Sequence, residues 1–154
     1  MQNRVPERVN FINAETIAKE LGIEISINYS TSDSNYSNLI STRVVAKNDI
    51  IFEGSVFNDD LPRLVNLMGY KMEVNLEGTL LFIQNDDVPG VVGKIGTILG
   101  ENKINIGAYL LSQHSKKMLA FAVIRLDSPI EDKLINKLQI VNEVKFVNQI
   151  QITS

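Results

Sequence analysis

The chain has 154 residues, of which 44% are hydrophobic, a length that suits one domain or two small ones with a real core. Its formal net charge is −3, and neither half is basic: there are 7 basic and 11 acidic residues up to Glu77, then 8 and 7. These values disfavour a nucleic-acid-binding role, and the lack of cysteine excludes disulfides, thiolate metal sites and cysteine nucleophiles.

The first ten residues are polar and lack the apolar core of a signal peptide. No apolar run approaches the length needed to cross a membrane. We therefore expect a cytoplasmic protein that has no membrane partner.

The chain opens with one helix pattern and one strand pattern. Apolar residues keep helical spacing over residues 9–21, and Gly22 follows as a stop signal. Ile23, Ile25 and Ile27 then alternate with polar residues, which predicts a half-buried strand.

The next segments predict a loop followed by two hairpins. Residues 30–38 are rich in polar turn formers and are expected to form the loop. Residues 39–45 and 50–57 form the first predicted hairpin, and residues 61–67 and 70–74 form the second. Residues 1–77 are therefore expected to be a small antiparallel α+β domain.

Residues 78–154 are expected to form a second domain with a βαββαβ element order. This order predicts a ferredoxin-like fold, with two helices on one face of an antiparallel sheet and the other face left for a partner or ligand. The predicted elements are a strand at 79–84, a helix at 88–101, strands at 104–112 and 118–126, a helix at 130–138 and a strand at 144–152.

A polar turn joins the first strand of this second half to its first helix. Backbone N–H groups at a helix start suit a small carboxylate, and Asp87 beside them can hold an ammonium group. The turn therefore predicts a site for a zwitterionic amino acid.

Other features of this half have simpler explanations. Gly93, Gly96 and Gly100 indicate close packing of the helix backbone, because the segment has neither a dinucleotide fingerprint nor a Walker motif. Asp86 and Asp87 are adjacent on a turn, where side chains usually point apart, so we expect no catalytic dyad.

The remaining polar residues give no sign of catalysis or of a metal site. His114, the only histidine, is expected to be a solvated turn residue, as are Lys116 and Lys117. Further nitrogen or sulfur ligands for zinc are missing, so we expect neither catalytic residues nor a metal in this chain.

Residues 85–100 (NDDVPGVVGKIGTILG) and 104–106 (INI) resemble an ACT domain, the amino-acid-sensing module of metabolic enzymes. The earlier part resembles the allosteric-substrate-binding domain that precedes the ACT domain in long-form D-3-phosphoglycerate dehydrogenases. That resemblance lies in residues 9–14, 36–39, 54–57, 62–65 and 69–70, and the whole match runs from about residue 9 to residue 152.

The resemblance implies a regulatory piece of an NAD-dependent oxidoreductase of L-serine biosynthesis. In the family, the substrate and NAD domains precede this region, and the resemblance implies that the intermediate domain here lacks its opening strand. We therefore expect an N-terminally truncated regulatory fragment with no cofactor of its own and no turnover, NAD being bound elsewhere in the parent enzyme.

The resemblance also implies a site for L-serine or another small amino acid at an interface between two ACT domains. It implies a homodimer through these domains and a tetramer in the parent enzyme. Relatives carry His or Tyr where this chain has Asn85, which leaves the identity of the amino acid open. The implied effector-binding residues are Asn85, Asp87, Val88, Pro89, Gly90, Asn105 and Ile106.

Relatives also have an anion site built from basic side chains in the intermediate domain. Arg63 and Arg125 match two of its positions, while Asn75 stands at a third, so the implied site is weakened. Without the resemblance, Arg63 reads as a surface strand charge, and Asn85 and Asn105 read as a helix cap and a turn residue.

Three rival functions stay open from the sequence. The first is a free-standing ACT regulatory subunit that acts in trans on another enzyme of amino-acid metabolism. The second is an autonomous enzyme using Asp86, Asp87 and His114. The third is an RNA-binding ferredoxin-like domain, although the central strands lack the spaced aromatic residues that stack bases.

Overall fold

The computed structural model describes residues 12–29, 36–45, 49–58, 60–114 and 116–152, which form two compact units divided after residue 33. Within these ranges, no helix is long and apolar enough to cross a membrane.

The first unit contains one short helix. The helix predicted at 9–21 is observed as α1 (Ala14–Glu20), and residues 9–11 lie outside the described ranges. The predicted stop at Gly22 is confirmed: this residue has φ +71°, and the N–H of Ile23 donates to the carbonyl of Ala18 at 2.8 Å.

The strand predicted at Ile23, Ile25 and Ile27 is wrong for the described residues. The segment pairs with no described strand, and the three side chains are 52%, 54% and 72% exposed. Alternation of polar and apolar residues favours an extended chain, but a strand also needs a neighbour to accept its hydrogen bonds, which the pattern does not supply.

The second unit begins with a four-stranded antiparallel sheet in the order β1-β2-β3-β4. Both predicted hairpins are confirmed, while residues 30–35 of the predicted loop and 46–48 of the first turn lie outside the described residues. The strands are β1 (Ile40–Val44), β2 (Ile50–Val56), β3 (Pro62–Leu67) and β4 (Tyr70–Asn75).

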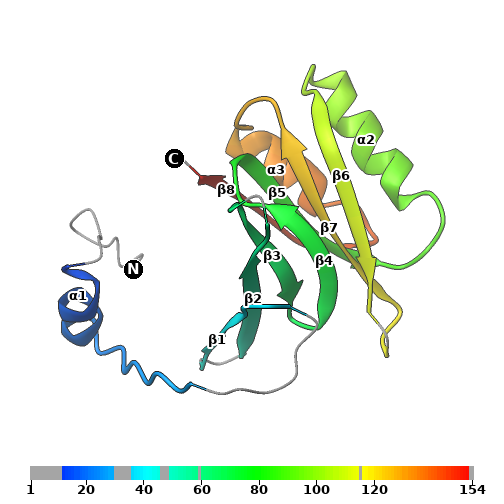
Figure 1. Ribbon diagram of the computed structural model, residues 1–154. Helices are drawn as coiled ribbons and strands as arrows, with labels where there is room; N and C mark the ends of the chain where they lie inside the picture. The colour runs from blue at the N-terminus through cyan, green and yellow to red at the C-terminus, as the bar shows by residue number, and fades with distance from the viewer. Residues whose placement is uncertain (1–11, 30–35, 46–48, 59, 115, 153–154) are drawn as a thin grey trace. The chain divides into compact units, whose positions relative to one another are not determined.

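The rest of the chain forms the predicted βαββαβ arrangement, with an antiparallel sheet in the order β6-β7-β5-β8 (Figure 1). The α+β class is therefore confirmed. The elements are β5 (Gly78–Asp86), α2 (Val91–Glu101), β6 (Ile106–Gln113), β7 (Leu119–Leu126), α3 (Asp132–Gln139) and β8 (Val144–Ile152).

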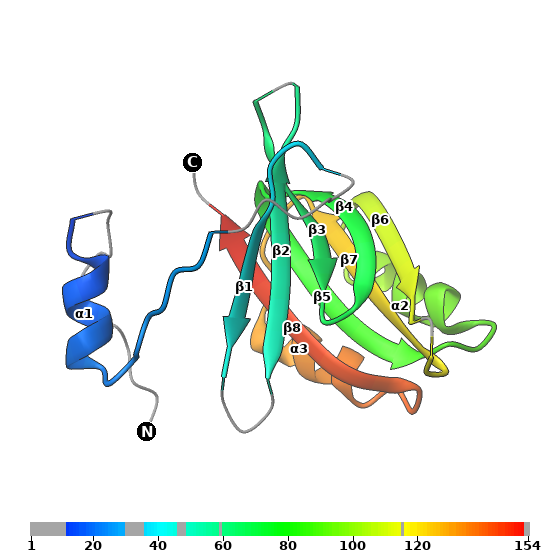
Figure 2. The same ribbon diagram turned by 60° about the horizontal axis from the view of Figure 1, so that its bottom comes forward.

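Helices α2 and α3 cover one face of this second sheet, and the first sheet lies over the other face (Figure 2). Phe82, Phe121 and Val123 of the second sheet pack with Tyr70 and Val74 of β4. The expectation that this face would be left for a partner or ligand is therefore wrong over β5 and β7, which the chain covers with its own strands, while Phe146 and Ile150 of β8 are 42% and 45% exposed.

This arrangement explains why β5 and β7 are apolar at both parities: they are buried from both sides. The predicted boundary at residue 77 falls in the short link between β4 and β5. The division of the chain into domains at that point stays a prediction.

Candidate functional site

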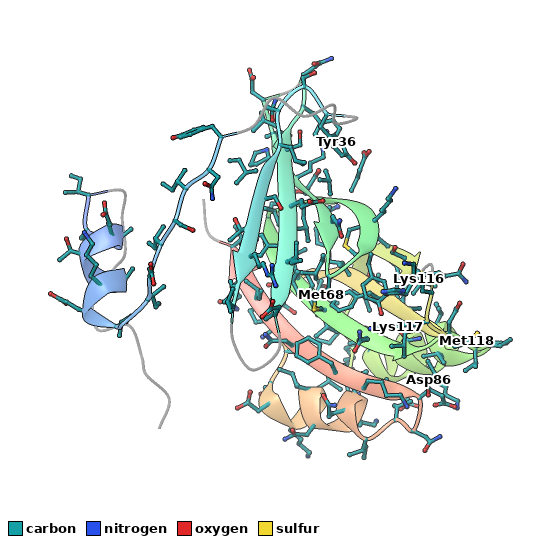
Figure 3. The ribbon with its side chains drawn as sticks, turned by 90° about the horizontal axis from the view of Figure 1, so that it is seen from below. Tyr36, Met68, Asp86, Lys116, Lys117 and Met118 are labelled. Carbon is teal, nitrogen blue, oxygen red and sulfur yellow. The ribbon has the colours of Figure 1, made fainter. Side chains whose placement is uncertain are left out.

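The polar turn after β5 is held by backbone hydrogen bonds to two neighbouring segments. The N–H of Asp86 donates to the carbonyl of Glu143 at 2.8 Å, and the N–H of Asp87 donates to the carbonyl of Met118 at 3.1 Å. Asp86 and Met118 lie at the same end of the sheet (Figure 3), where Asp86 pairs with Leu119. The turn therefore has a fixed backbone.

Asn85 is the buried polar residue of this turn, with 3% of its surface exposed. Its Nδ2 donates to the carbonyl of Asp86 at 2.7 Å, but its Oδ1 is buried without a hydrogen-bond partner among the described residues. A buried acceptor left unpaired costs about 1–3 kcal/mol. Asn85 does not cap α2: the N-cap residue of this helix is Gly90, and there is no side-chain cap hydrogen bond.

Asp87 is half-buried and directed toward the end of β6. Its Oδ2 accepts a hydrogen bond from Nε2 of Gln113 at 2.8 Å. Sequence reasoning missed Gln113, because a single polar residue at a strand end carries no signal until strand pairing places it beside Asp87.

The first turn of α2 lies just beyond Asp87. Val88, Pro89 and Gly90 are exposed, and Gly90 has φ +93°, a left-handed conformation that glycine adopts without strain. The helix was predicted to begin at residue 88, but it begins at Val91, after these three residues. The first N–H groups of a helix lack intrahelical acceptors and carry the positive end of its dipole, so they can bind a carboxylate.

Asn105 and Ile106 lie at the opposite end of the sheet. Ile106 of β6 and Thr79 of β5 both pair with Leu126 of β7, so these residues lie at the same end of the sheet. Asp86 is seven residues after Thr79 on β5 and lies at the other end. At roughly 3.3 Å per residue, the two groups of predicted site residues are about 20 Å apart in one chain. A single chain therefore does not bring Asp87 and Asn105 together.

Asp86 and Asp87 have separate partners. Oδ2 of Asp86 is 2.7 Å from Nζ of Lys145. Beside them, Nζ of Lys94 is 2.5 Å from Oε1 of Glu143, and this hydrogen bond is the main cause of a lowered pKa of Glu143.

His114 is not the fully solvated turn residue that the sequence predicted. Its ring is half-buried and packs edge-on against Tyr70, with the centroids 5.1 Å apart, and its Nδ1 accepts from the N–H of Lys116 at 3.1 Å. Lys116 and Lys117 are exposed, as predicted. The described residues include no group of three or more His, Asp or Glu side chains that could hold a metal ion.

The predicted anion-site residues lie near one another. Nε of Arg63 donates to Oδ1 of Asn75 at 3.0 Å, and Asn75 and Arg125 line the same cleft of about 180 Å³. Glu73 also lines this cleft, and NH1 of Arg125 is 2.5 Å from Oε1 of Glu77. Arg125 is therefore already paired with a carboxylate, and the anion site stays a prediction.

Comparison with known proteins relates the chain to one enzyme family. Residues 1–68 match the model of the D-3-phosphoglycerate dehydrogenase intervening domain. The chain is 32% identical over 153 residues to a D-3-phosphoglycerate dehydrogenase of Bacillus subtilis, covering 99% of this chain and 29% of the relative.

Similar matches come from other organisms. D-3-phosphoglycerate dehydrogenases of Mycobacterium leprae and Methanocaldococcus jannaschii are 29% and 28% identical, each over 90% of this chain. The chain covers 28% and 26% of these relatives. It therefore spans less than a third of the length of the curated relatives that it matches.

Proposed function

Because this chain is related to the D-3-phosphoglycerate dehydrogenases over nearly its whole length, we propose that it is the regulatory part of such an enzyme. In this proposal it binds an amino-acid effector, L-serine, and so provides feedback control of L-serine biosynthesis in the cytoplasm. Catalysis and NAD binding belong to other parts of the parent enzyme.

The observation that carries this proposal is the arrangement of polar groups at the end of β5. The Asp87 carboxylate can pair with an ammonium group, and the N–H groups at the start of α2 can bind a carboxylate. Asn85, whose Oδ1 is buried without a hydrogen-bond partner among the described residues, belongs to the same turn. A free amino acid presents both charges a few ångströms apart, which matches this arrangement.

The site is completed by a second copy of the chain. Strand β6 is an edge of its sheet, so it can pair antiparallel with β6 of another copy. Antiparallel pairing brings the start of one strand to the end of the other. Asn105 of the second copy would then lie near Asp87 of the first, although the two are far apart within one chain.

The sequence of β6 favours such pairing. Proteins usually protect an exposed edge strand with charged residues or proline, and β6 (IGAYLLSQ) has neither, while its Leu111 is 44% exposed. On the adjacent α2, a Cβ added at Gly93, Gly96 or Gly100 would meet no atom within 4 Å in the described chain. The close neighbour that these glycines predict is therefore not among the described residues, which fits a helix of the second copy.

Regulation follows from binding between two copies. A ligand held by residues of both copies favours the interface geometry in which those residues converge. The ligand can shift the equilibrium between this geometry and any other only by the difference between its affinities for the two. The homodimer and the tetramer of the parent enzyme are part of this proposal.

The experiment is isothermal titration calorimetry of L-serine with the wild-type chain and with Asp87→Ala and Asn105→Ala. We expect each substitution to weaken binding about 10- to 100-fold, because each removes a hydrogen bond to a charged ligand group worth about 1.5–3 kcal/mol. Asn148→Ala, at an exposed residue of β8, is the matched control and should leave the affinity unchanged.

Two results would contradict the proposal in different ways. Unchanged affinity in both Asp87→Ala and Asn105→Ala would remove the site. Failure of the wild-type chain to bind L-serine or any other common amino acid would remove the sensing function itself.

A further inference from the structure

We propose that Gln113 contacts the ammonium group of the effector through its side-chain oxygen and forms, together with Asp87, the ammonium subsite. This inference rests on the proposed function and adds a residue that neither the sequence pattern nor the resemblance assigns to the site.

The geometry starts from the bond between the two side chains. Nε2 of Gln113 donates to Oδ2 of Asp87 at 2.8 Å, which fixes the orientation of the amide because a carboxylate only accepts. The amide oxygen Oε1 is therefore the remaining acceptor next to the carboxylate. An ionised carboxylate offers about four acceptor positions, so Asp87 can keep the bond to Gln113 and still accept from a ligand.

These acceptors suit an ammonium group better than a single carboxylate would. An ammonium group has three N–H donors, and one carboxylate satisfies only part of them. With Oε1 of Gln113 beside Asp87, two donors find acceptors on neighbouring side chains. A ligand that lacks the ammonium group gains nothing from this pair.

Both members of the pair have fixed backbones. Asp87 is anchored to the carbonyl of Met118, and the residue after Gln113, His114, donates its N–H to the carbonyl of Leu119 at 2.9 Å. The ring of His114 also packs on Tyr70, which is 1% exposed. These backbone bonds hold the turn and the strand end in place, and the bond between Gln113 and Asp87 orients the two side chains before the ligand arrives.

Gln113 also lies where the second copy is expected. It is the last residue of the edge strand β6, and antiparallel pairing of two copies would place it next to the start of the other β6. The Asp87–Gln113 pair of one copy would then meet Asn105 of the other at the bound amino acid.

The test compares Gln113→Met, which keeps the side-chain length but removes the acceptor, with Gln113→Glu, which keeps acceptors but cannot donate to Asp87. The affinity for L-serine, or for whichever common amino acid the wild-type chain binds best, is measured by calorimetry. We expect Gln113→Met to bind about 10-fold more weakly, and Gln113→Glu to bind within about threefold of wild type. Gln151→Met, at the opposite end of the sheet, is the control and should not change the affinity.

Comparing the affinities of Gln113→Met and Gln113→Glu for the amino acid distinguishes a ligand contact of Gln113 from a purely structural role. If Gln113 only holds Asp87 by donating to it, Gln113→Glu should bind no better than Gln113→Met, because two carboxylates repel each other. If Gln113→Glu bound no better than Gln113→Met, or if Gln113→Met kept the wild-type affinity, the inference would be overturned and the proposed function would stand. No amino-acid binding to the wild-type chain would overturn both.

Discussion

At the scale of single residues, Glu143 shows how the fold changes the chemistry of one side chain. The hydrogen bond from Lys94 lowers its pKa, with a smaller contribution from its own backbone. The folded chain therefore binds a proton at Glu143 more weakly than the unfolded chain does. The resulting stabilisation is present above the unfolded pKa and is lost as the pH falls through the lower pKa of the folded state.

We predict that Glu143→Gln reduces the difference in unfolding free energy between pH 7 and pH 3. Glutamine does not titrate, so the part of the acid destabilisation that comes from protonating Glu143 disappears. Urea unfolding of both proteins at several pH values would measure this effect. Glu101→Gln is the control, since its contact with Lys137 is longer, at 3.3 Å; equal pH dependence in wild type and Glu143→Gln would contradict the prediction.

At the scale of secondary-structure elements, helix α2 combines a buried apolar face with glycines that are exposed (Gly93 and Gly100) or half-buried (Gly96). Val91, Ile95 and Leu99 are at most 2% exposed and pack in the core. An added Cβ at Gly96 has open space in the described chain, although an interior glycine costs a helix about 0.5–1 kcal/mol relative to alanine. We therefore expect Gly96, which no contact within the described chain requires, to serve a contact with another chain.

We predict that Gly96→Ala acts in opposite directions on stability and on self-association. The unfolding free energy of the single chain should rise by about 0.5–1 kcal/mol, while association of two copies should weaken because the new methyl group separates the helices. Urea unfolding at low protein concentration and analytical ultracentrifugation measure the two effects.

Gly78→Ala provides the comparison for this prediction. At φ +68° the backbone disfavours any residue with a Cβ, so this variant should lose about 1 kcal/mol without a direct effect on association. If Gly96→Ala associated as strongly as wild type, the glycines of α2 would need an explanation other than a second copy.

At the scale of the whole molecule, the sequence predicted local elements better than their partners. The second half was predicted closely, because hydrophobic periodicity and the stop and turn signals determine helices and strands locally. The strand at Ile23, Ile25 and Ile27 was wrong, and the cover of the second sheet by the first was not predicted. Both depend on which segments meet in space, and periodicity does not carry that information.

The residues of the candidate site likewise divide into those that local sequence predicts and those that depend on strand pairing. Asp87 and the start of α2 could be predicted from one continuous stretch of sequence. Gln113 is 26 residues further along the chain, and only the pairing of β6 with β7 and of β7 with β5 brings it beside Asp87. Residues of a site that come from different strands therefore need the sheet topology before they can be found.

The shared core of the two sheets leads to a prediction about the second unit as a whole. Tyr70 of β4 is 1% exposed, its ring lies 5.2 Å from that of Phe121, and its hydroxyl accepts from Nε2 of Gln84 at 3.1 Å. Tyr70→Phe should lose about 1 kcal/mol with the hydrogen bond, and Tyr70→Ala about 3–5 kcal/mol, because it also leaves a cavity between the sheets. Urea unfolding of the variants measures both losses.

Hydrogen exchange on Tyr70→Ala then tests whether the two sheets form one cooperative unit. Because the same apolar cluster joins residues of β3, β4, β5 and β7, amides of β4 and β5 should lose protection together, by about the loss in global unfolding free energy. If the amides of β1–β4 exchanged freely while those of β5–β8 kept wild-type protection, the two sheets would be separate stability units. That result would support a domain boundary at residue 77 and would mean that the first sheet covers the second without stabilising it.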